Sequence, residues 1–266
     1  MKRITILIAS VYCVGIALGQ TGNSKRALAP AEQAAVIEKV REHALSYTRQ
    51  LPNYICTQRT RQMISRGSFG QMRGGVDVIE EQISFVDNRE TRRVVSLNGH
   101  PVAADSPDQQ RGTPSRGEFG TILEVIFDPQ TAANLQWERP TTLDHRRLYV
   151  LAYRVPQSKG YTLTESKRKI QVPYRGFVYA DAETLGVVRI EMKVLVTDIP
   201  KDSEYVNVGL TLGYEPEQVA GQEFILPAHY WLHYQMRNGM ATYLAEYTNY
   251  RKFSADATIK FEGDKQ

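Results

Sequence analysis

The sequence predicts an α+β fold in which a large curved antiparallel β-sheet, an incomplete barrel, is covered by an N-terminal helix and a short internal helix. From Tyr174 to Tyr250 apolar and polar residues alternate with period two, and turn residues interrupt the pattern at short intervals. A single amphipathic helix precedes these segments at Pro30 to Leu51. A sheet with one apolar face must cover that face with a helix, another sheet or a ligand. The pattern therefore indicates an architecture, and function depends on what provides the cover.

The alternation is clearest between Val187 and Val196, where apolar residues occupy the even positions and Arg189 and Lys193 point the other way. The segment from Tyr205 to Tyr214 repeats it. We expect Val188, Ile190, Met192 and Val194 to lie opposite Leu212, Leu210, Val208 and Val206. These positions would form one continuous apolar surface, which Phe177 and Tyr179 would extend to a further strand.

The dipeptide Asn238-Gly239 predicts a two-residue hairpin and is the strongest local turn signal in the chain. Centring the turn on it pairs Tyr234 with Tyr243, Leu232 with Ala245, and Tyr230 with Tyr247. Together the predicted strands give a twisted sheet of about eight to eleven strands that curls around one or two helices.

The N-terminal helix should begin at Pro30, because proline suits the first helical position, and end before Pro52. Its apolar stripe recurs at spacings of three and four, as an amphipathic helix requires. The stripe consists of Val36, Ile37, Val40, Ala44, Tyr47 and Leu51. We expect this stripe to lie across the apolar face of the sheet.

Strands are also predicted at Tyr54 to Ser65, Val76 to Val86, Arg89 to Leu97, Arg146 to Val155 and Tyr161 to Val172. Residues 98–117 are rich in Pro, Gly, Gln and Asp and predict a mobile loop. Ser115 and Glu118 form a capping-box pattern that would open a short helix, which Pro129 would stop. Its stripe would be Phe119, Ile122, Leu123 and Ile126.

The first residues have the composition of a secretory signal peptide. Lys2 and Arg3 precede an apolar run from Ile4 to Leu18, which is shorter than the ~20 apolar residues of a membrane-spanning helix. We therefore expect a signal peptide at 1–19, a flexible leader at 20–29 and a single domain at 30–262. This organisation implies a periplasmic or secreted protein with no transmembrane segment after signal removal.

Charge and cysteine content narrow the classes of partner. The formal net charge is +4, and Lys2 and Arg3 supply two of those charges, so a nucleic-acid partner is not expected.

Removal of Cys13 with the signal would leave Cys56 without an internal disulfide partner. Cys56 is then best interpreted as a buried small apolar residue, with a nucleophile or an intermolecular bridge as the weaker alternatives.

The sequence contains no catalytic or metal-binding motif that predicts an enzyme. His229 and His233 are four residues apart, but on a strand that spacing spans about 13 Å, too far for both to bind one metal ion. We expect this pair to lie on a solvated strand face shared with Trp231. Accordingly, no catalytic residue, metal ligand or cofactor is predicted.

The chain resembles the periplasmic lipoprotein-carrier superfamily, the LolA/LolB-like proteins, and a group of uncharacterised secreted bacterial proteins of that fold. The resemblance lies in the order of elements and in Leu51 to Tyr54, Gly117 to Gly120, Gly176 to Gly186 and the closing segment Tyr247 to Phe253. It implies an incomplete β-barrel closed by helices, with an apolar cavity that holds acyl chains.

The leading functional hypothesis is a non-enzymatic carrier or sensor of an apolar ligand, such as a lipid or a lipoprotein acyl chain. The alternatives are an interaction module for an envelope protein, in envelope assembly or envelope-stress signalling, and, less favoured, an outer-membrane barrel. A core that is fully packed, with tyrosine hydroxyls at its rim, would also satisfy the pattern. The expected cavity wall consists of Val188, Ile190, Met192, Val208, Leu210, Tyr230, Leu232, Tyr234, Tyr243 and Tyr247.

Overall fold

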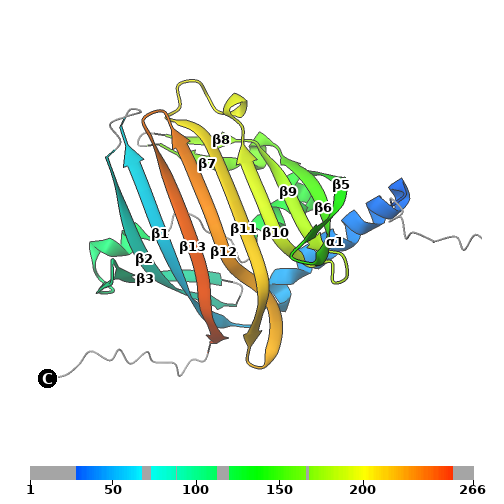
Figure 1. Cartoon of the computed structure of the whole chain (residues 1–266), viewed down its shortest axis with the longest axis horizontal. Helices are drawn as coiled ribbons and strands as arrows, with labels where there is room; N and C mark the ends of the chain where they lie inside the picture. The colour runs from blue at the N-terminus through cyan, green and yellow to red at the C-terminus, as the bar shows by residue number, and fades with distance from the viewer. Residues whose placement is uncertain (1–27, 68–72, 88, 113–119, 166–167, 254–266) are drawn as a thin grey trace, which may run out of the picture.

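One open antiparallel sheet of eleven strands dominates the molecule. In the computed structural model, which describes residues 28–67, 73–87, 89–112, 120–165 and 168–253, the strands lie in the order β4-β3-β2-β1-β13-β12-β11-β10-β9-β6-β5 (Figure 1). The sheet strands are β1 (Tyr54–Arg66), β2 (Arg73–Val86), β3 (Arg89–Leu97), β4 (His100–Pro101), β5 (Asn134–Leu143), β6 (Arg146–Val155), β9 (Tyr174–Asp181), β10 (Val187–Val194), β11 (Tyr205–Val219), β12 (Gln222–Met236) and β13 (Gly239–Lys252). This is the predicted incomplete barrel.

The described residues also contain two α-helices and a separate hairpin. The helices are α1 (Pro30–Gln50) and α2 (Thr121–Phe127), and the hairpin pairs β7 (Tyr161–Thr164) with β8 (Lys169–Val172). Short 3₁₀ turns lie at η1 (Pro107–Arg111), η2 (Pro129–Thr131), η3 (Gln157–Lys159) and η4 (Val196–Asp198). None of these helices is long and apolar enough to cross a bilayer, as far as the structure describes the chain.

The N-terminal helix has the predicted limits to within one residue. Pro30 is its first residue, and the Glu32 carboxylate accepts a hydrogen bond from the Ala29 backbone N–H at 2.7 Å, which satisfies a donor at the helix start. The chain becomes extended at Leu51, directly before Pro52.

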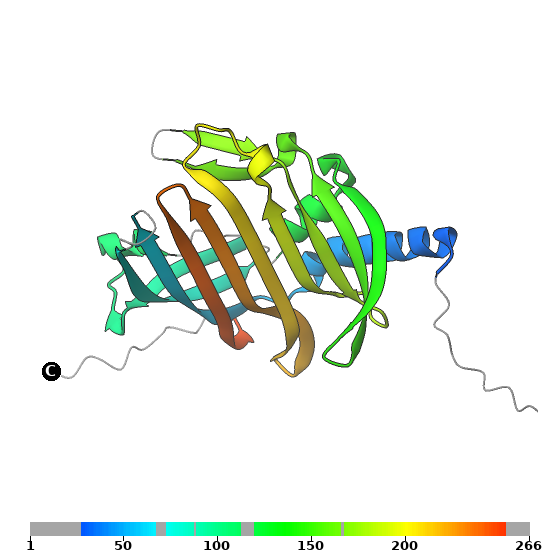
Figure 2. The ribbon, with the colours of Figure 1, turned by 45° about the horizontal axis from the view of Figure 1, so that its top comes forward.

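The sheet curls around α1 and α2, and we call the side that they cover the concave face and the opposite side the outer face (Figures 1 and 2). Val40 and Ala44 of α1 are buried in the core. The Tyr47 hydroxyl donates to the Ile225 carbonyl at 2.7 Å, and its ring meets Tyr214 edge-on with centroids 6.1 Å apart. The Arg41 guanidinium donates to the Phe127 carbonyl of α2 at 2.7 Å. The predicted cover of the apolar face by the first helix is confirmed.

The exposed fractions of successive side chains on the strands alternate as predicted. On β12, Tyr230 and Leu232 are each 1% exposed, whereas Trp231 between them is 41% exposed. On β10, Ile190 and Val194 are fully buried, but a β-bulge between Val187 and Arg189 disturbs the start of the strand. Because a bulge adds one residue to one strand, Val187 is buried there and Val188 is only half-buried.

The predicted strand registers are wrong by two residues. Ile190, and not Val188, lies opposite Leu212. The second error arises at the hairpin, where the two turn residues are Arg237 and Asn238, since Met236 pairs with Gly239. The observed pairs are Tyr234 with Ala241, Leu232 with Tyr243, and Tyr230 with Ala245. A shift of two residues keeps every side chain on its predicted face, so the apolar surface survives both corrections.

Three strand features differ from the sequence prediction. The segment Tyr161 to Val172 forms the β7–β8 hairpin instead of one strand of the main sheet. Strand β5 was not predicted because Pro140 interrupts it, yet β5 is an edge strand, where proline is tolerated. The turn between β11 and β12 is Ala220-Gly221, whose φ angles of +54° and +80° suit a tight hairpin turn.

Part of the segment expected to be a mobile loop lies against the sheet. The Gln109 side chain accepts from the Val94 N–H at 2.9 Å and donates to the Val94 carbonyl at 2.8 Å. Arg111 forms an ion pair with Asp77 at 2.8 Å. Residues 113–117 of that segment, the predicted capping box and Phe119 lie outside the described residues, as do 1–27.

The difference in exposure between two adjacent residues of β10 can be used to test which side chains face the core. Met192 is 5% exposed and faces the core, while Lys193 is exposed on the outer face. Met192→Asp should unfold the domain because an unpaired carboxylate would be buried, whereas Lys193→Asp should change the free energy of unfolding by no more than about 0.5 kcal/mol. Urea titrations followed by circular dichroism measure both, and equal tolerance of the two variants would contradict the described register.

Candidate functional site

A hollow of about 420 Å³ lies at the end of the concave face that the β7–β8 hairpin covers. We call it the hairpin hollow. The sheet contributes concave-face residues from β1, β11, β12 and β13, and the hairpin contributes β7. Its lining includes Ile64, Tyr161, Leu163, Tyr205, Tyr234, Ala241 and Tyr243.

Tyrosines dominate the wall of the hairpin hollow. The hydroxyls of Tyr161 and Tyr234 are 2.6 Å apart and join the hairpin to the sheet. The Tyr234 ring lies 5.6 Å from that of Tyr205 and 6.1 Å from that of Tyr243, between centroids. The Tyr205 hydroxyl donates to the Thr164 carbonyl at 2.9 Å. Each ring therefore presents an apolar body while its hydroxyl makes a polar contact.

Tyrosine hydroxyls are protonated at neutral pH, and burial makes ionisation of Tyr205, Tyr234 and Tyr243 still harder. Burial raises the pKa of Tyr234 and of Tyr243, and it raises the pKa of Tyr205 to about 12. A protonated hydroxyl can donate and accept hydrogen bonds but is no base. The cluster is therefore suited to holding polar groups of a ligand and lacks the ionised form that proton abstraction requires.

A polar cluster fixes the hairpin turn to the connection between β10 and β11. The Glu165 carboxylate accepts from the Ser203 hydroxyl at 2.6 Å, from the Glu204 N–H at 3.0 Å and from Arg168 at 2.8 Å. Arg168 also donates to Asp202 at 2.8 Å. The hydrogen bond from Ser203, followed by that from Arg168, lowers the pKa of Glu165. Glu165 is therefore ionised at neutral pH and anchors the hairpin.

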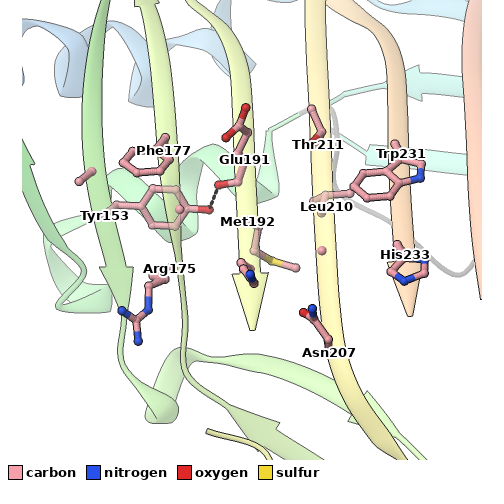
Figure 3. Close-up of a pocket in the computed structure, with 14 residues that line it drawn as sticks. Tyr153, Arg175, Phe177, Glu191, Met192, Asn207, Leu210, Thr211, Trp231 and His233 are labelled. Carbon is pink, nitrogen blue, oxygen red and sulfur yellow. Dashed lines mark hydrogen bonds between the residues drawn. The ribbon is translucent and has the colours of Figure 1, made fainter. Parts of the chain in front are cut away.

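A second hollow, of about 450 Å³, lies on the outer face over β6, β9, β10, β11 and β12 (Figure 3). We call it the outer groove. Its outward-facing lining includes Arg175, Phe177, Lys193, Thr211, Trp231 and His233. The side chain of Trp231 stacks on that of His233, with ring centroids 5.7 Å apart.

A glycine leaves part of the space that the groove occupies. Gly209 faces outward between Lys193 and His233 in the register, so no side chain fills that position. Gly176 lies on the other face, opposite Met192, where a Cβ would come within 1.7 Å of the Glu191 carbonyl oxygen, so this glycine permits close packing. That same carbonyl accepts a hydrogen bond from the Tyr153 hydroxyl at 3.0 Å, as Figure 3 shows.

The structure does not gather the expected cavity-wall residues around one cavity. Tyr234 and Tyr243 line the hairpin hollow, and Met192 and Leu210 line the outer groove. Val188 is half-buried beside the bulge. The others are packed in the core, each at most 3% exposed, namely Ile190, Val208, Tyr230, Leu232 and Tyr247.

Residues outside that expected set complete both hollows. Tyr161 and Tyr205 were missed because the docking of the hairpin is a tertiary contact. Trp231 was missed because the alternation predicts an outward direction, which sequence reasoning treats as solvent-facing. Phe177 was expected on the apolar face, but Val178 pairs with Ile190 on that face and Phe177 pairs with Glu191 on the outer face. An exposed tryptophan in an otherwise polar strand face was the available signal.

The remaining candidate residues show no arrangement for metal binding. His229 and His233 share the outer face of β12, and the His233 ring contacts the Thr242 hydroxyl at 3.0 Å. Within the described residues, no group of three or more His, Cys, Asp and Glu side chains could hold a metal ion. Cys56 is 1% exposed, and burial raises the pKa of its thiol to about 12.

No protein-family model and no curated protein matches the chain. Among solved structures, it is similar to an outer membrane lipoprotein-sorting protein domain from Vibrio parahaemolyticus (12% identity, 86% of this chain and 94% of that chain, TM-score 0.44). It is also similar to a LolA superfamily protein from Nitrosomonas europaea (11% identity, 82% of this chain and 94% of that chain, TM-score 0.40). A third similar structure is a DUF1329 family protein from Desulfovibrio piger (10% identity, 84% of this chain and 95% of that chain, TM-score 0.38). The resemblance expected from the sequence is thus met among solved structures, but at these identities and TM-scores it carries no argument about function.

Removal of one hydroxyl should loosen the hairpin. Tyr161→Phe deletes the 2.6 Å contact with Tyr234 and should lower the free energy of unfolding by about 1 kcal/mol, with faster amide hydrogen exchange in β7 and β8. The matched control is Tyr149→Phe, a half-buried tyrosine that packs against Trp137 outside the hollow. Unchanged exchange in the hairpin of the Tyr161 variant would show that this contact does not hold it.

The Cys56 thiol should be inert in the folded protein. Only the thiolate reacts with alkylating reagents, and a pKa of about 12 leaves almost none of it at pH 8. In a Cys13→Ser protein, we expect maleimide labelling of Cys56 to be at least about 100-fold slower in buffer than in denaturant. Rapid labelling of the native protein, measured by mass spectrometry, would revive the nucleophile interpretation.

Proposed function

We propose that the protein is an exported, non-enzymatic carrier or sensor that binds an apolar ligand, such as a lipid or a lipoprotein acyl chain, on the concave side of the half-barrel. The observation that carries this proposal is the hairpin hollow, a space of about 420 Å³ between a docked hairpin and the tyrosine-lined end of the concave face. Its volume falls within the ~300–1,000 Å³ of small-molecule sites in proteins.

The lining of the hollow is more polar than apolar, so it suits the polar end of a ligand that also carries an apolar chain. Leu163 and Ala241 supply aliphatic surface, and the tyrosine rings supply flat apolar surface. Arg66 and Glu204 belong to the same lining and offer charged groups to a head group.

The hairpin can serve as the entrance. Strands β7 and β8 have four residues each and form their own two-stranded sheet, which is marginally stable by itself. Its position depends on the contact between Tyr161 and Tyr234, on the Glu165 cluster, and on Leu163 and Val172, which are each 1% exposed in the core. A two-stranded unit outside the main sheet is expected to open at a lower free energy than the eleven-stranded sheet does. Opening it would expose the end of the apolar core.

The non-enzymatic part of the proposal is supported by the burial of Cys56, which raises the pKa of its thiol to about 12. The export part is supported by the basic and apolar composition of residues 1–19.

Native mass spectrometry of the gently purified protein tests the proposal. We expect co-purifying lipid, or saturable binding of added fatty acid or phospholipid. Ala241→Phe should fill the hollow and reduce this binding by at least about 10-fold. Thr248→Phe, which adds a similar ring at an exposed position on the outer face of the same strand, should bind as the unmodified protein does. Clean apo spectra with no uptake of either lipid class would overturn the proposal.

A further inference from the structure

We propose that the outer groove is a second binding site, specific for an amphipathic anion, that is, a molecule with an apolar chain that ends in a carboxylate or a phosphate. The groove lies on the face opposite α1 and α2, so this inference is independent of ligand binding on the concave side (Figures 1 and 3).

A row of cations crosses three neighbouring strands at one end of the groove. Arg154 of β6 lies opposite Arg175 of β9, which lies opposite Lys193 of β10. Neighbouring strands are about 4.8 Å apart, and like charges placed directly opposite destabilise a sheet. Within the described chain, none of the three has an acidic partner within ion-pair distance. A bound anion would offset this repulsion.

The carboxylate in the lining of the outer groove, that of Glu191, already pairs with an arginine outside the cation row. Glu191 follows in the next row, and its carboxylate pairs with Arg189 at 2.9 Å. Figure 3 shows Glu191 directed away from Arg175. The end of the groove at Arg175 and Lys193 therefore keeps an uncompensated positive charge.

The row beside the cations carries apolar side chains at both ends, with Glu191 and Thr211 between them. Phe177 lies opposite Glu191 on one side, and Trp231, 41% exposed, lies opposite Thr211 on the other. Leu244 is opposite Trp231 and is 39% exposed, so it extends the apolar surface to β13. Large apolar side chains that gather on one exposed face mark interaction surfaces.

The arrangement fixes the orientation of the ligand. In Figure 3, Arg175 and Asn207 lie toward one end of the groove, and Phe177 and Trp231 toward the other. The head group would lie between Arg175 and Lys193, and the chain would lie along Phe177 and Trp231. The volume of about 450 Å³ suits such a molecule.

The fluorescence of Trp231 reports directly on the groove. The chain has two tryptophans, so Trp137→Phe leaves Trp231 as the single reporter. We expect a saturable fluorescence change with monomeric dodecanoate and dodecyl phosphate. Dodecanol, which lacks the charge, and dodecyltrimethylammonium, which reverses it, should bind at least about 10-fold more weakly.

Charge-removing variants separate the site from general electrostatics. In the same background, Arg175→Gln with Lys193→Gln should weaken dodecanoate binding at least about 10-fold. The control variant Lys39→Gln with Arg49→Gln also removes two positive charges, but from exposed positions on α1 on the other side of the sheet. It should leave dodecanoate binding unchanged. Ala241→Phe, which fills the hairpin hollow, should also leave the Trp231 titration unchanged. A negative result for the outer groove can therefore be distinguished from a negative result for ligand binding in the hairpin hollow.

Four results would overturn the proposal. These are no saturable response to either anion, equal affinity for dodecanol, no loss of affinity in the Arg175 and Lys193 variant, and a response to anionic phospholipid vesicles alone. The last would indicate that the outer face contacts a membrane surface and takes up no single molecule. A stronger response to dodecyl phosphate or to dodecanoate identifies the head group within the proposal.

Discussion

The structure depends on burial of the concave face of an open sheet. An eleven-stranded sheet that does not close on itself leaves one apolar side without a second sheet to cover it. Helix α1, helix α2 and the β7–β8 hairpin divide that task, and each is held by a small number of specific contacts, such as Arg41 to Phe127 and Tyr161 to Tyr234. Where the helices cover the face, the core is packed and residues such as Ile190 and Leu212 are fully buried. Where the hairpin covers it, a hollow remains.

Sequence reasoning reached the features that local rules control. The limits of α1 follow from Pro30, Pro52 and a clear apolar stripe, and the faces of β10 to β13 follow from alternation. Register did not follow, because Arg237-Asn238 forms the turn in place of the stronger signal Asn238-Gly239. Strand β5 was not predicted because it contains Pro140, which lacks a backbone N–H; edge strands tolerate proline, whereas central strands do not.

The candidate sites were harder to predict for a physical reason. The hairpin hollow exists because Glu165 reaches Ser203 and Tyr161 reaches Tyr234, contacts between residues distant in the chain. The outer groove exists because strand pairing places Arg175 beside Lys193 and Gly209 leaves a space. Neither arrangement has a signature within a short window of sequence. What the alternation did supply was the side of the sheet on which Tyr234 and Lys193 lie, which is a starting point for both proposals.

The edge strands described above have a consequence for the behaviour of the protein in concentrated solution. A half-barrel exposes two borders whose backbone groups could recruit strands from other molecules. Here one border is β3, whose end pairs with the two-residue β4 and whose Val94 backbone groups bond to the Gln109 side chain, and the other is β5, interrupted by a bulge between Trp137 and Arg139 and by Pro140. Both borders are poor templates for an added strand. The molecule can therefore keep its sheet open without offering the continuous edge from which fibrous aggregates grow.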